Sequence, residues 1–169
     1  MTGPDDDAEL REMARRVIDQ NRYLVLGTVE PDGRPRLSPV FFTPARYRDF
    51  YWVSSPDATH SVNIAVRPEV GIAIFDSQAA IGVGQGVYMS ATATLLEGDE
   101  AARGIEAFSA RSAAHGAQAW TAQDVWPGAG LRLYRATADS YSILAKDGRP
   151  DHRIAVPLGG PALVGQGAA

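Results

Sequence analysis

Residues 50–75 of the chain, FYWVSSPDATHSVNIAVRPEVGIAIF, decide the fold that the sequence predicts. The stretch opens on aromatic and β-branched residues, which favour a β-strand. Asp57 suits the N-cap of a short helix, and Arg67-Pro68 ends that helix, because the residue before a proline avoids helical backbone angles. The apolar run over 70–75 then forms a further strand. The stretch is therefore predicted to fold as strand, short helix and strand.

A helix and a β-hairpin are predicted upstream of this stretch. Apolar residues over 10–18 recur at the spacing of one helical face, behind an acidic first turn. Residues 23–30 are apolar and β-branched, and they meet the turn tripeptide PDG at 31–33, whose glycine tolerates a positive φ. Residues 34–43 then return as the hairpin partner.

Downstream, a glycine-rich loop over 77–86 leads into a long strand over 87–97. Asp99 is predicted to cap a second helix over about residues 100–115, whose Ala-rich face suits close packing. The last part of the chain returns to short strands, which are predicted over 131–138, 141–145 and 153–157.

The order of these elements predicts the fold class. Six or more strands in hairpin order, with only two or three helices among them, indicate an antiparallel Greek-key barrel rather than a parallel βαβ sheet. We therefore expect a mainly β protein with flanking helices, in the α+β class. A chain of 169 residues with 45% hydrophobic content closes one core, so residues 1–158 are expected to be a single domain. Residues 159–169 are small and rich in glycine, which predicts a flexible tail.

Composition excludes several kinds of partner and site. The net charge of −4 and the pI near 5.3 argue against a nucleic-acid binder, which usually carries a basic face. The chain has no cysteine, so disulfides and thiolate-bound metals are excluded. No window approaches the roughly 20 apolar residues of a membrane helix, and no signal-like segment follows the acidic N-terminus. We expect a cytoplasmic protein without a nucleic-acid or membrane partner.

Catalysis by side chains has no clear pattern in the sequence. His60, His115 and His152 lack the spacings of known metal sites, so no metal is predicted. No serine lies in a GxSxG elbow between strand and helix, which argues against a hydrolase triad. The segment GVGQG at 82–86 precedes a strand instead of a helix, so it is not interpreted as a dinucleotide loop. No catalytic residue is therefore predicted.

One short segment has the properties of an anion site. Residues 57–61, DATHS, directly follow a strand and are rich in hydrogen-bond donors. Free N–H groups and the helix dipole make a helix start suitable for a phosphate. The same residues also fit a capped surface helix with an incidental histidine. The local pattern leaves both interpretations open.

The order of four segments resembles a known family. The segments are GRPRLSPV at 33–40, FYWVS at 50–54, THSVNI at 59–64 and RPEV at 67–70. Each is common alone, but the ordered set over residues 23–97 resembles the pyridoxamine 5'-phosphate oxidase-like family. The resemblance implies a split β-barrel that works as a homodimer, with FMN in a groove between the two subunits.

The resemblance also implies which residues contact FMN. The strand at 36–40 would meet the flavin ring with its backbone, and the next strand and the following helix start would approach the phosphate. One glutamine would enter from the partner subunit. The implied contact residues are Arg36, Leu37, Ser38, Pro39, Val40, Val53, Ser54, Ser55, Thr59, His60, Ser61 and Gln85.

Two departures from the family pattern remove positive charge near that phosphate. The family's Arg-Lys pair aligns with Thr59 and His60, and the basic residue that often ends the second strand is Phe41 here. Weak FMN affinity is expected, because neutral donors bind phosphate less strongly than arginine does. F420 or haem therefore stays open as another cofactor. Four arginines could supply the missing charge from nearby, namely Arg34, Arg36, Arg46 or Arg48.

The function implied by the resemblance is a flavin-dependent oxidoreductase acting on a small organic molecule, with NAD(P)H as a candidate electron partner. The flavin ring would carry the hydride or electron chemistry, which accounts for the missing catalytic residues. The C-terminal segment lacks the family's Trp-and-Arg ending, so pyridoxamine phosphate oxidation itself is not expected. The alternatives are an F420- or haem-binding relative and a cofactor-free dimeric binding protein.

Two sets of apolar residues are candidates for the interface of such a dimer. One set is Val83, Val87, Met89 and Leu95, and the other is the stretch over 120–126. For each of these residues, a position in the hydrophobic core is as good an interpretation as a position in the interface.

Overall fold

The computed structural model describes residues 4–146, 149–150 and 152–158, so the tail predicted over 159–169 lies outside the described residues. Within those ranges the chain forms three α-helices, one short 3-10 helix and eight strands. In chain order they are α1 (Pro4–Gln20), β1 (Tyr23–Val29), β2 (Pro35–Phe41), β3 (Thr43–Ala45), β4 (Asp49–Ser54), α2 (Thr59–Val66), β5 (Glu69–Phe75), β6 (Gly86–Leu95), α3 (Gly98–Ala114), η1 (Ala122–Val125), β7 (Arg132–Leu144) and β8 (Arg153–Ala155).

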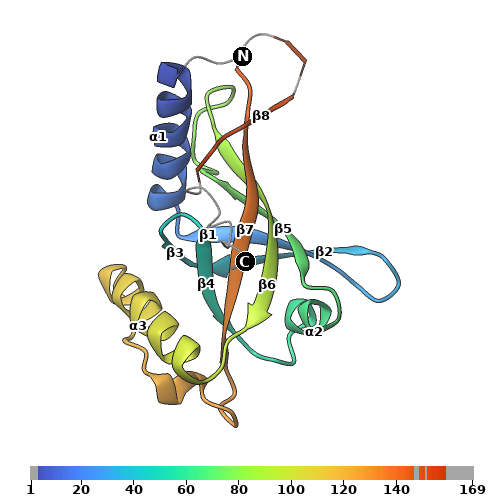
Figure 1. The fold of residues 1–169 in the computed structure, drawn as a ribbon, viewed down its shortest axis with the longest axis vertical. Coiled ribbons are helices and arrows are strands. Elements are labelled where there is room, and N and C mark those ends of the chain that lie inside the picture. The colour runs from blue at the N-terminus through green and yellow to red at the C-terminus, as the bar shows by residue number, and fades with distance from the viewer. Residues whose placement is uncertain (1–3, 147–148, 151, 159–169) are drawn as a thin grey trace, which may run out of the picture.

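The strands form one antiparallel sheet that curls into a half-barrel (Figure 1). Its order is β2-β1-β5-β6-β7-β4-β3, and β8 pairs with β7. β1 pairs with β5, and β7 joins β6 to β4, so several neighbours in the sheet are distant in the sequence. The predicted antiparallel Greek-key split barrel, mainly β with flanking helices, is confirmed.

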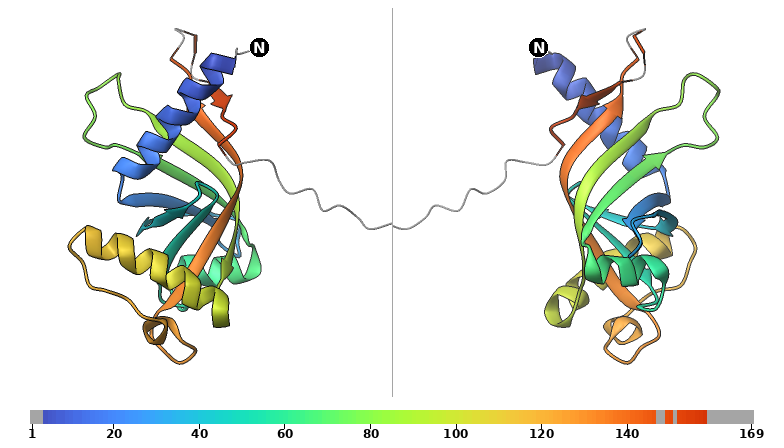
Figure 2. Two further views of the ribbon diagram at one scale, coloured as in Figure 1. Left: turned by 60° about the vertical axis from the view of Figure 1, so that its left-hand side comes forward. Right: turned by 90° about the vertical axis from the view of Figure 1, so that its right-hand side faces the viewer.

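Each helix covers a different part of the sheet (Figures 1 and 2). α1 packs on β5 and β6 and buries Ala14 and Ile18 in the inner core. α2 packs on β1, β2 and β6 toward the other end of the sheet and buries Ile64. α3 packs on β3, β4 and β7, where Phe108 and Leu133 share a smaller cluster. Within the described residues, no helix is long and apolar enough to cross a membrane.

The candidate interface residues divide between core and surface. Val87 and Met89 are buried in the inner core, and Leu95 packs against it. Val83 and Trp126 are exposed. A further apolar surface lies on the outer face of β1, β2 and β5, where the exposed side chains are Tyr23, Val29, Leu37 and Phe75.

The last long strand differs from the prediction. Two strands are predicted over 131–138 and 141–145, but β7 runs through both. The register with β6 shifts at this point, so that Asp139 is an extra residue in β7. Such a bulge bends a strand without ending it. The sequence prediction places a turn at Asp139 and Ser140 because the same residue types form turns and bulges.

Both predicted N-caps are wrong. α2 begins after Ala58 instead of Asp57, and α3 begins after Glu97, and neither of these caps has a side-chain hydrogen bond to its helix. A turn held by Ser55 explains the first shift, because its hydroxyl accepts the N–H of Asp57 and its carbonyl accepts the N–H of Ala58. In α3, Asp99 lies inside the first turn, where its charge still favours the helix dipole.

We predict that Gly104→Val destabilises the protein. A β-carbon at this position would lie 2.8 Å from Leu133 Cδ2 and 3.1 Å from Tyr51 Cε1, in the cluster under α3. Overpacking of this kind costs about 1–3 kcal/mol, which thermal unfolding can measure. Ala113→Val changes an exposed position of the same helix and is the control, with an expected loss of about 0.5 kcal/mol from helix propensity. Equal unfolding midpoints would contradict this packing.

Candidate functional site

A serine and a histidine meet where β4 leads into α2. Ser54 is the last residue of β4, His60 is the second residue of α2, and Ser54 Oγ lies 2.8 Å from His60 Nε2. Both side chains are half-buried, and the turn between them is held by hydrogen bonds to Ser55. Ser54 and His60 are called the serine–histidine pair below. Two residues predicted near the phosphate are therefore in direct contact.

The start of α2 offers unpaired backbone donors. The first N–H groups of a helix have no intrahelical acceptor. Within the described residues, the N–H groups of Thr59, His60 and Ser61 have no other acceptor, because the N-cap residue Ala58 provides no side-chain oxygen. Free N–H groups and the positive end of the helix dipole favour an anion. The helix start is therefore suited to a phosphate oxygen.

An arginine that the sequence analysis missed lies on the neighbouring strand. Arg132 pairs directly with Ser54 across β4 and β7, so the two side chains share a face. Its Nη2 donates to Glu97 Oε1 at 2.9 Å, while its Nε is buried without a hydrogen-bond partner among the described residues. Arg132 therefore brings a positive charge to the strand position next to Ser54. Only the strand register reveals this residue.

Arg36, the strand residue predicted to reach the phosphate, is held in an ion pair. Its Nε donates to Glu30 Oε1 at 2.7 Å, and its Nη2 contacts the same oxygen. The charge of Arg36 is therefore balanced by Glu30 before any ligand arrives.

The other proposed sources of charge do not gather at the serine–histidine pair. Arg34 pairs with Asp32 in the β1–β2 turn. Arg46 and Arg48 lie in the turn before β4, at the opposite end of that strand from the pair. Within the described ranges, no group of three or more histidine and acidic residues could hold a metal ion.

Asn63, which the sequence analysis did not single out, fixes α2 on the sheet. Its Nδ2 donates to Thr28 Oγ1 at 3.0 Å, and both side chains are buried. Its carbonyl accepts the N–H of Arg67 at 2.8 Å, and Arg67 Nη1 donates to the Glu30 carbonyl at 3.2 Å. Breaking a buried polar pair is costly, so this network sets the position of the helix start. In the sequence, this role is indicated by a single amide side chain among the apolar residues of the helix.

Burial lowers the pKa of the His60 imidazole below its ordinary value. The side chain is therefore neutral near pH 7. A neutral imidazole has one donor and one acceptor nitrogen, so either Ser54 or His60 can donate in the bond between them. A protonated His60 must donate, which frees the Ser54 hydrogen for another acceptor. Proton uptake would thus add both a charge and a donor to the site.

The predicted contact residues of the strands lie on two faces of the sheet. Ser38 and Val40 lie on the inner face, whereas Leu37 and Pro39 lie on the outer face. Val53 packs in the cluster under α3. β2 contacts both β4, which carries Ser54, and α2, which carries His60. The structure therefore brings only part of the predicted set together.

Gln85 lies far from this pair within one copy of the chain. Its Nε2 donates to the Leu144 carbonyl at 3.0 Å, and its Oε1 accepts the N–H of Gly86 at the start of β6. The serine–histidine pair lies near the other end of β6, because Ser54 pairs with Arg132 of β7, and Leu95 at the end of β6 pairs with Tyr134 two residues further on. A ten-residue strand spans roughly 30 Å. One copy cannot bring Gln85 to the pair.

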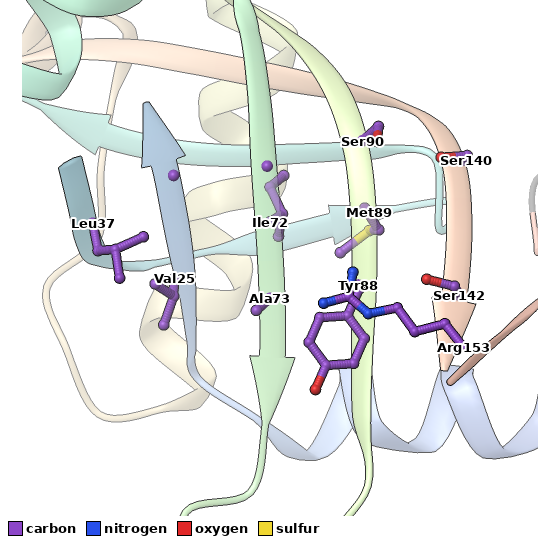
Figure 3. A pocket seen from close by; sticks show the side chains of 12 residues that line it. Val25, Leu37, Ile72, Ala73, Tyr88, Met89, Ser90, Ser140, Ser142 and Arg153 are labelled. Atoms are coloured by element: carbon purple, nitrogen blue, oxygen red, sulfur yellow. The ribbon is translucent and has the colours of Figure 1, made fainter. Parts of the chain in front are cut away.

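A groove crosses the outer face of the sheet (Figure 3). Its volume is about 330 Å³, and Leu37 stands at one side. At the other side the Arg153 guanidinium carbon lies 3.8 Å from the ring centroid of Tyr88. The floor is formed by small residues in register across four strands, namely Gly27, Gly71, Ser90 and Ser140.

The curled antiparallel sheet, with a donor-rich helix start after β4, defines a split-barrel protein. The chain belongs to the pyridoxamine 5'-phosphate oxidase family, whose model matches residues 10–140. The resemblance found in the sequence is confirmed. No curated protein matches this sequence.

Solved structures of the same fold carry several descriptions. A heme binding protein from Mycobacterium smegmatis is 21% identical, with a TM-score of 0.66 over 92% of this chain and 60% of its own. HutZ, the heme storage protein from Vibrio cholerae, is 21% identical, with a TM-score of 0.61 over 77% of this chain and 90% of its own. An F420 reductase is 14% identical, with a TM-score of 0.57 over 76% and 95%. Such likeness shows the fold alone.

We predict that an NMR titration gives His60 a pKa below the ordinary value of about 6.5. Below that pH the unfolded chain takes up a proton before the folded chain does, so stability falls as the pH decreases. His60→Asn removes this part of the dependence, because asparagine does not titrate. The pKa of His115 is also lowered, and its contribution to the pH dependence of stability is the same in the wild type and the variant. A His60 pKa above the ordinary value would contradict its burial.

Proposed function

We propose that this protein binds FMN with the phosphate at the start of α2, and acts as an oxidoreductase on a small organic molecule. One observation carries the proposal: the serine–histidine pair lies at the start of α2, beside the free N–H groups of residues 59–61, and Arg132 occupies the strand position paired with Ser54. All of them can donate to an anion. Membership of the family supports a flavin nucleotide as the molecule that carries this anion. A cytoplasmic location and NAD(P)H as electron donor belong to the same proposal.

The chain's own residues bind and orient the cofactor in this proposal. FMN, when bound, supplies the hydride or electron transfer. Ser54 and the first N–H groups of α2 donate to phosphate oxygens, and Arg132 contributes positive charge from the next strand. Asn63 keeps the helix start in place through its buried bond to Thr28. The site therefore needs no catalytic side chain of its own.

F420 is the second candidate cofactor, because the site carries little free positive charge. Arg36 is balanced by Glu30, and Arg132 is shared with Glu97. A phosphate monoester such as that of FMN carries a charge of about −1.5 to −2 near pH 7. The phosphodiester of F420 carries a single negative charge, which mostly neutral donors can accommodate at lower cost.

We also propose a homodimer formed through the outer face of the sheet. Exposed apolar side chains gather there, and Leu37 is 69% exposed beside the floor of the groove in Figure 3. Apolar patches of this kind mark interaction surfaces. A second copy could also supply Gln85 to the serine–histidine pair, which one copy cannot do. The arrangement of the residues thus favours two copies per functional unit.

We predict that Arg132→Ala weakens FMN binding by about 1.5–3 kcal/mol, because it removes a charge-assisted hydrogen bond. Thr59→Arg combined with His60→Lys restores the basic pair of the family pattern and should tighten binding by a similar amount. Quenching of flavin fluorescence at fixed salt concentration measures both effects. Arg103→Ala removes an exposed arginine from α3 and is the matched control, with no expected change.

Absorbance spectra identify the cofactor in the same experiment. The protein is mixed with FMN, F420 or haem, and the unbound compound is then removed. Retained FMN supports the proposal, whereas retention of F420 or haem alone selects the corresponding alternative. If none is retained, the cofactor-free dimer becomes the better description. Equal FMN affinities of the Arg132→Ala and Arg103→Ala variants would place the phosphate elsewhere.

We predict that Leu37→Asp converts a dimer into a monomer, as measured by light scattering. A carboxylate at this exposed position would be buried without a partner in the proposed interface, which is costly. Trp126→Asp changes an exposed apolar residue of the other candidate interface and should leave the dimer intact. The reverse result would move the interface to the stretch over 120–126. A wild-type monomer would contradict the dimer altogether.

A further inference from the structure

An apolar groove of about 540 Å³ lies between α2 and the ends of β6 and β7. α2 supplies Ser61, Val62 and Ala65 to its wall, and the strands supply Leu95 and Tyr134. It is separate from the groove on the outer face in Figure 3, with which it shares no residue. The serine–histidine pair does not line it either. It therefore lies beside the proposed cofactor site without being part of it.

The Ser61 hydroxyl is an unpaired polar group in this groove. The residue is only 3% exposed, and its Oγ has no hydrogen-bond partner among the described residues. A buried hydroxyl without a partner lowers stability, and alanine at the same helical position would avoid that cost and favour the helix. Its N–H is one of the free donors at the start of α2, and the residue also lines the groove. The hydroxyl therefore lacks an acceptor for its hydrogen, which a ligand in the groove would supply.

The remaining lining restricts the chemistry of that ligand. No charged side chain lines the groove within the described residues, and most of its wall is apolar. A charged ligand would lose its hydration there without compensation. Tyr134 contributes an almost fully buried aromatic side chain to the wall, held in place by stacking on Trp52 with ring centroids 5.6 Å apart. Pockets of this composition bind small apolar molecules and orient them with a few polar groups.

We propose that this groove is a second binding site, for a small uncharged molecule with an apolar body and one hydrogen-bond acceptor. The acceptor, such as a carbonyl oxygen, takes the hydrogen of the Ser61 hydroxyl, and the apolar body lies between Ala65 and Tyr134. This site goes beyond the proposed cofactor function and does not depend on it. Binding here requires neither FMN nor a second copy of the chain.

The test uses acetophenone as the probe and ethylbenzene, which has a similar shape but lacks the carbonyl, as its control. Both are titrated into the ¹⁵N-labelled protein without cofactor. We expect acetophenone to shift the amide resonances of Ser61 and Ala65 and to bind more tightly than ethylbenzene. Ser61→Ala should weaken acetophenone binding about 2- to 10-fold, the value of one hydrogen bond, and leave ethylbenzene unchanged. Ser77→Ala, in an exposed loop, is the control variant and should change neither.

A second variant tests the location of the site. Ala65 is exposed on α2, so Ala65→Leu fills the groove from the helix side without disturbing the core, and it should block both compounds. Ser61→Ala should unfold at the same temperature as the wild type or higher, because it removes an unpaired hydroxyl. Equal affinities of the wild type for the two compounds, or unchanged binding in Ala65→Leu, would overturn the proposal. Failure of FMN binding would not affect this result.

Discussion

The pairing of β7 with both β6 and β4 is the constraint on which the rest of the structure depends. These strands are far apart in the sequence, and the 13-residue β7 holds them in one sheet. The bulge at Asp139 lets the strand bend while its pairing continues. The same pairing stacks Tyr134 on Trp52 in the core and places Arg132 beside Ser54. The pairing of β7 therefore determines both the curl of the sheet and the polar surroundings of the end of β4.

The short helix α2 links that framework to function. Its buried Asn63 fixes it to Thr28 on β1, so the free N–H groups of its first turn have a defined position. Successive residues of a helix point in directions about 100° apart. His60 therefore meets Ser54, while Ser61 next to it lines the apolar groove. Two neighbouring residues thus belong to two different sites.

Much of the fold could be predicted from the sequence, because strands, turns and helix ends depend on local preferences. The stop at Arg67 and the hairpin turn at Gly33, whose φ is 89°, follow from the residues themselves. The two N-caps and the continuity of β7 could not be predicted. A local turn around Ser55 moved the start of α2 by one residue. The bulge at Asp139 kept β7 continuous, and it depends on pairing with β6, which is distant in the sequence.

The sequence by itself determined the order of the main elements and the family, and it assigned Ser54 and His60 to one site because they are close along the chain. The tertiary structure alone decided which charges surround that pair. Arg36 is paired with Glu30, and Arg46 and Arg48 lie at the far end of β4. Arg132 of the neighbouring strand lies next to Ser54 instead. The physical reason is that strand register and ion pairing join residues distant in sequence, and local preferences do not encode those partners.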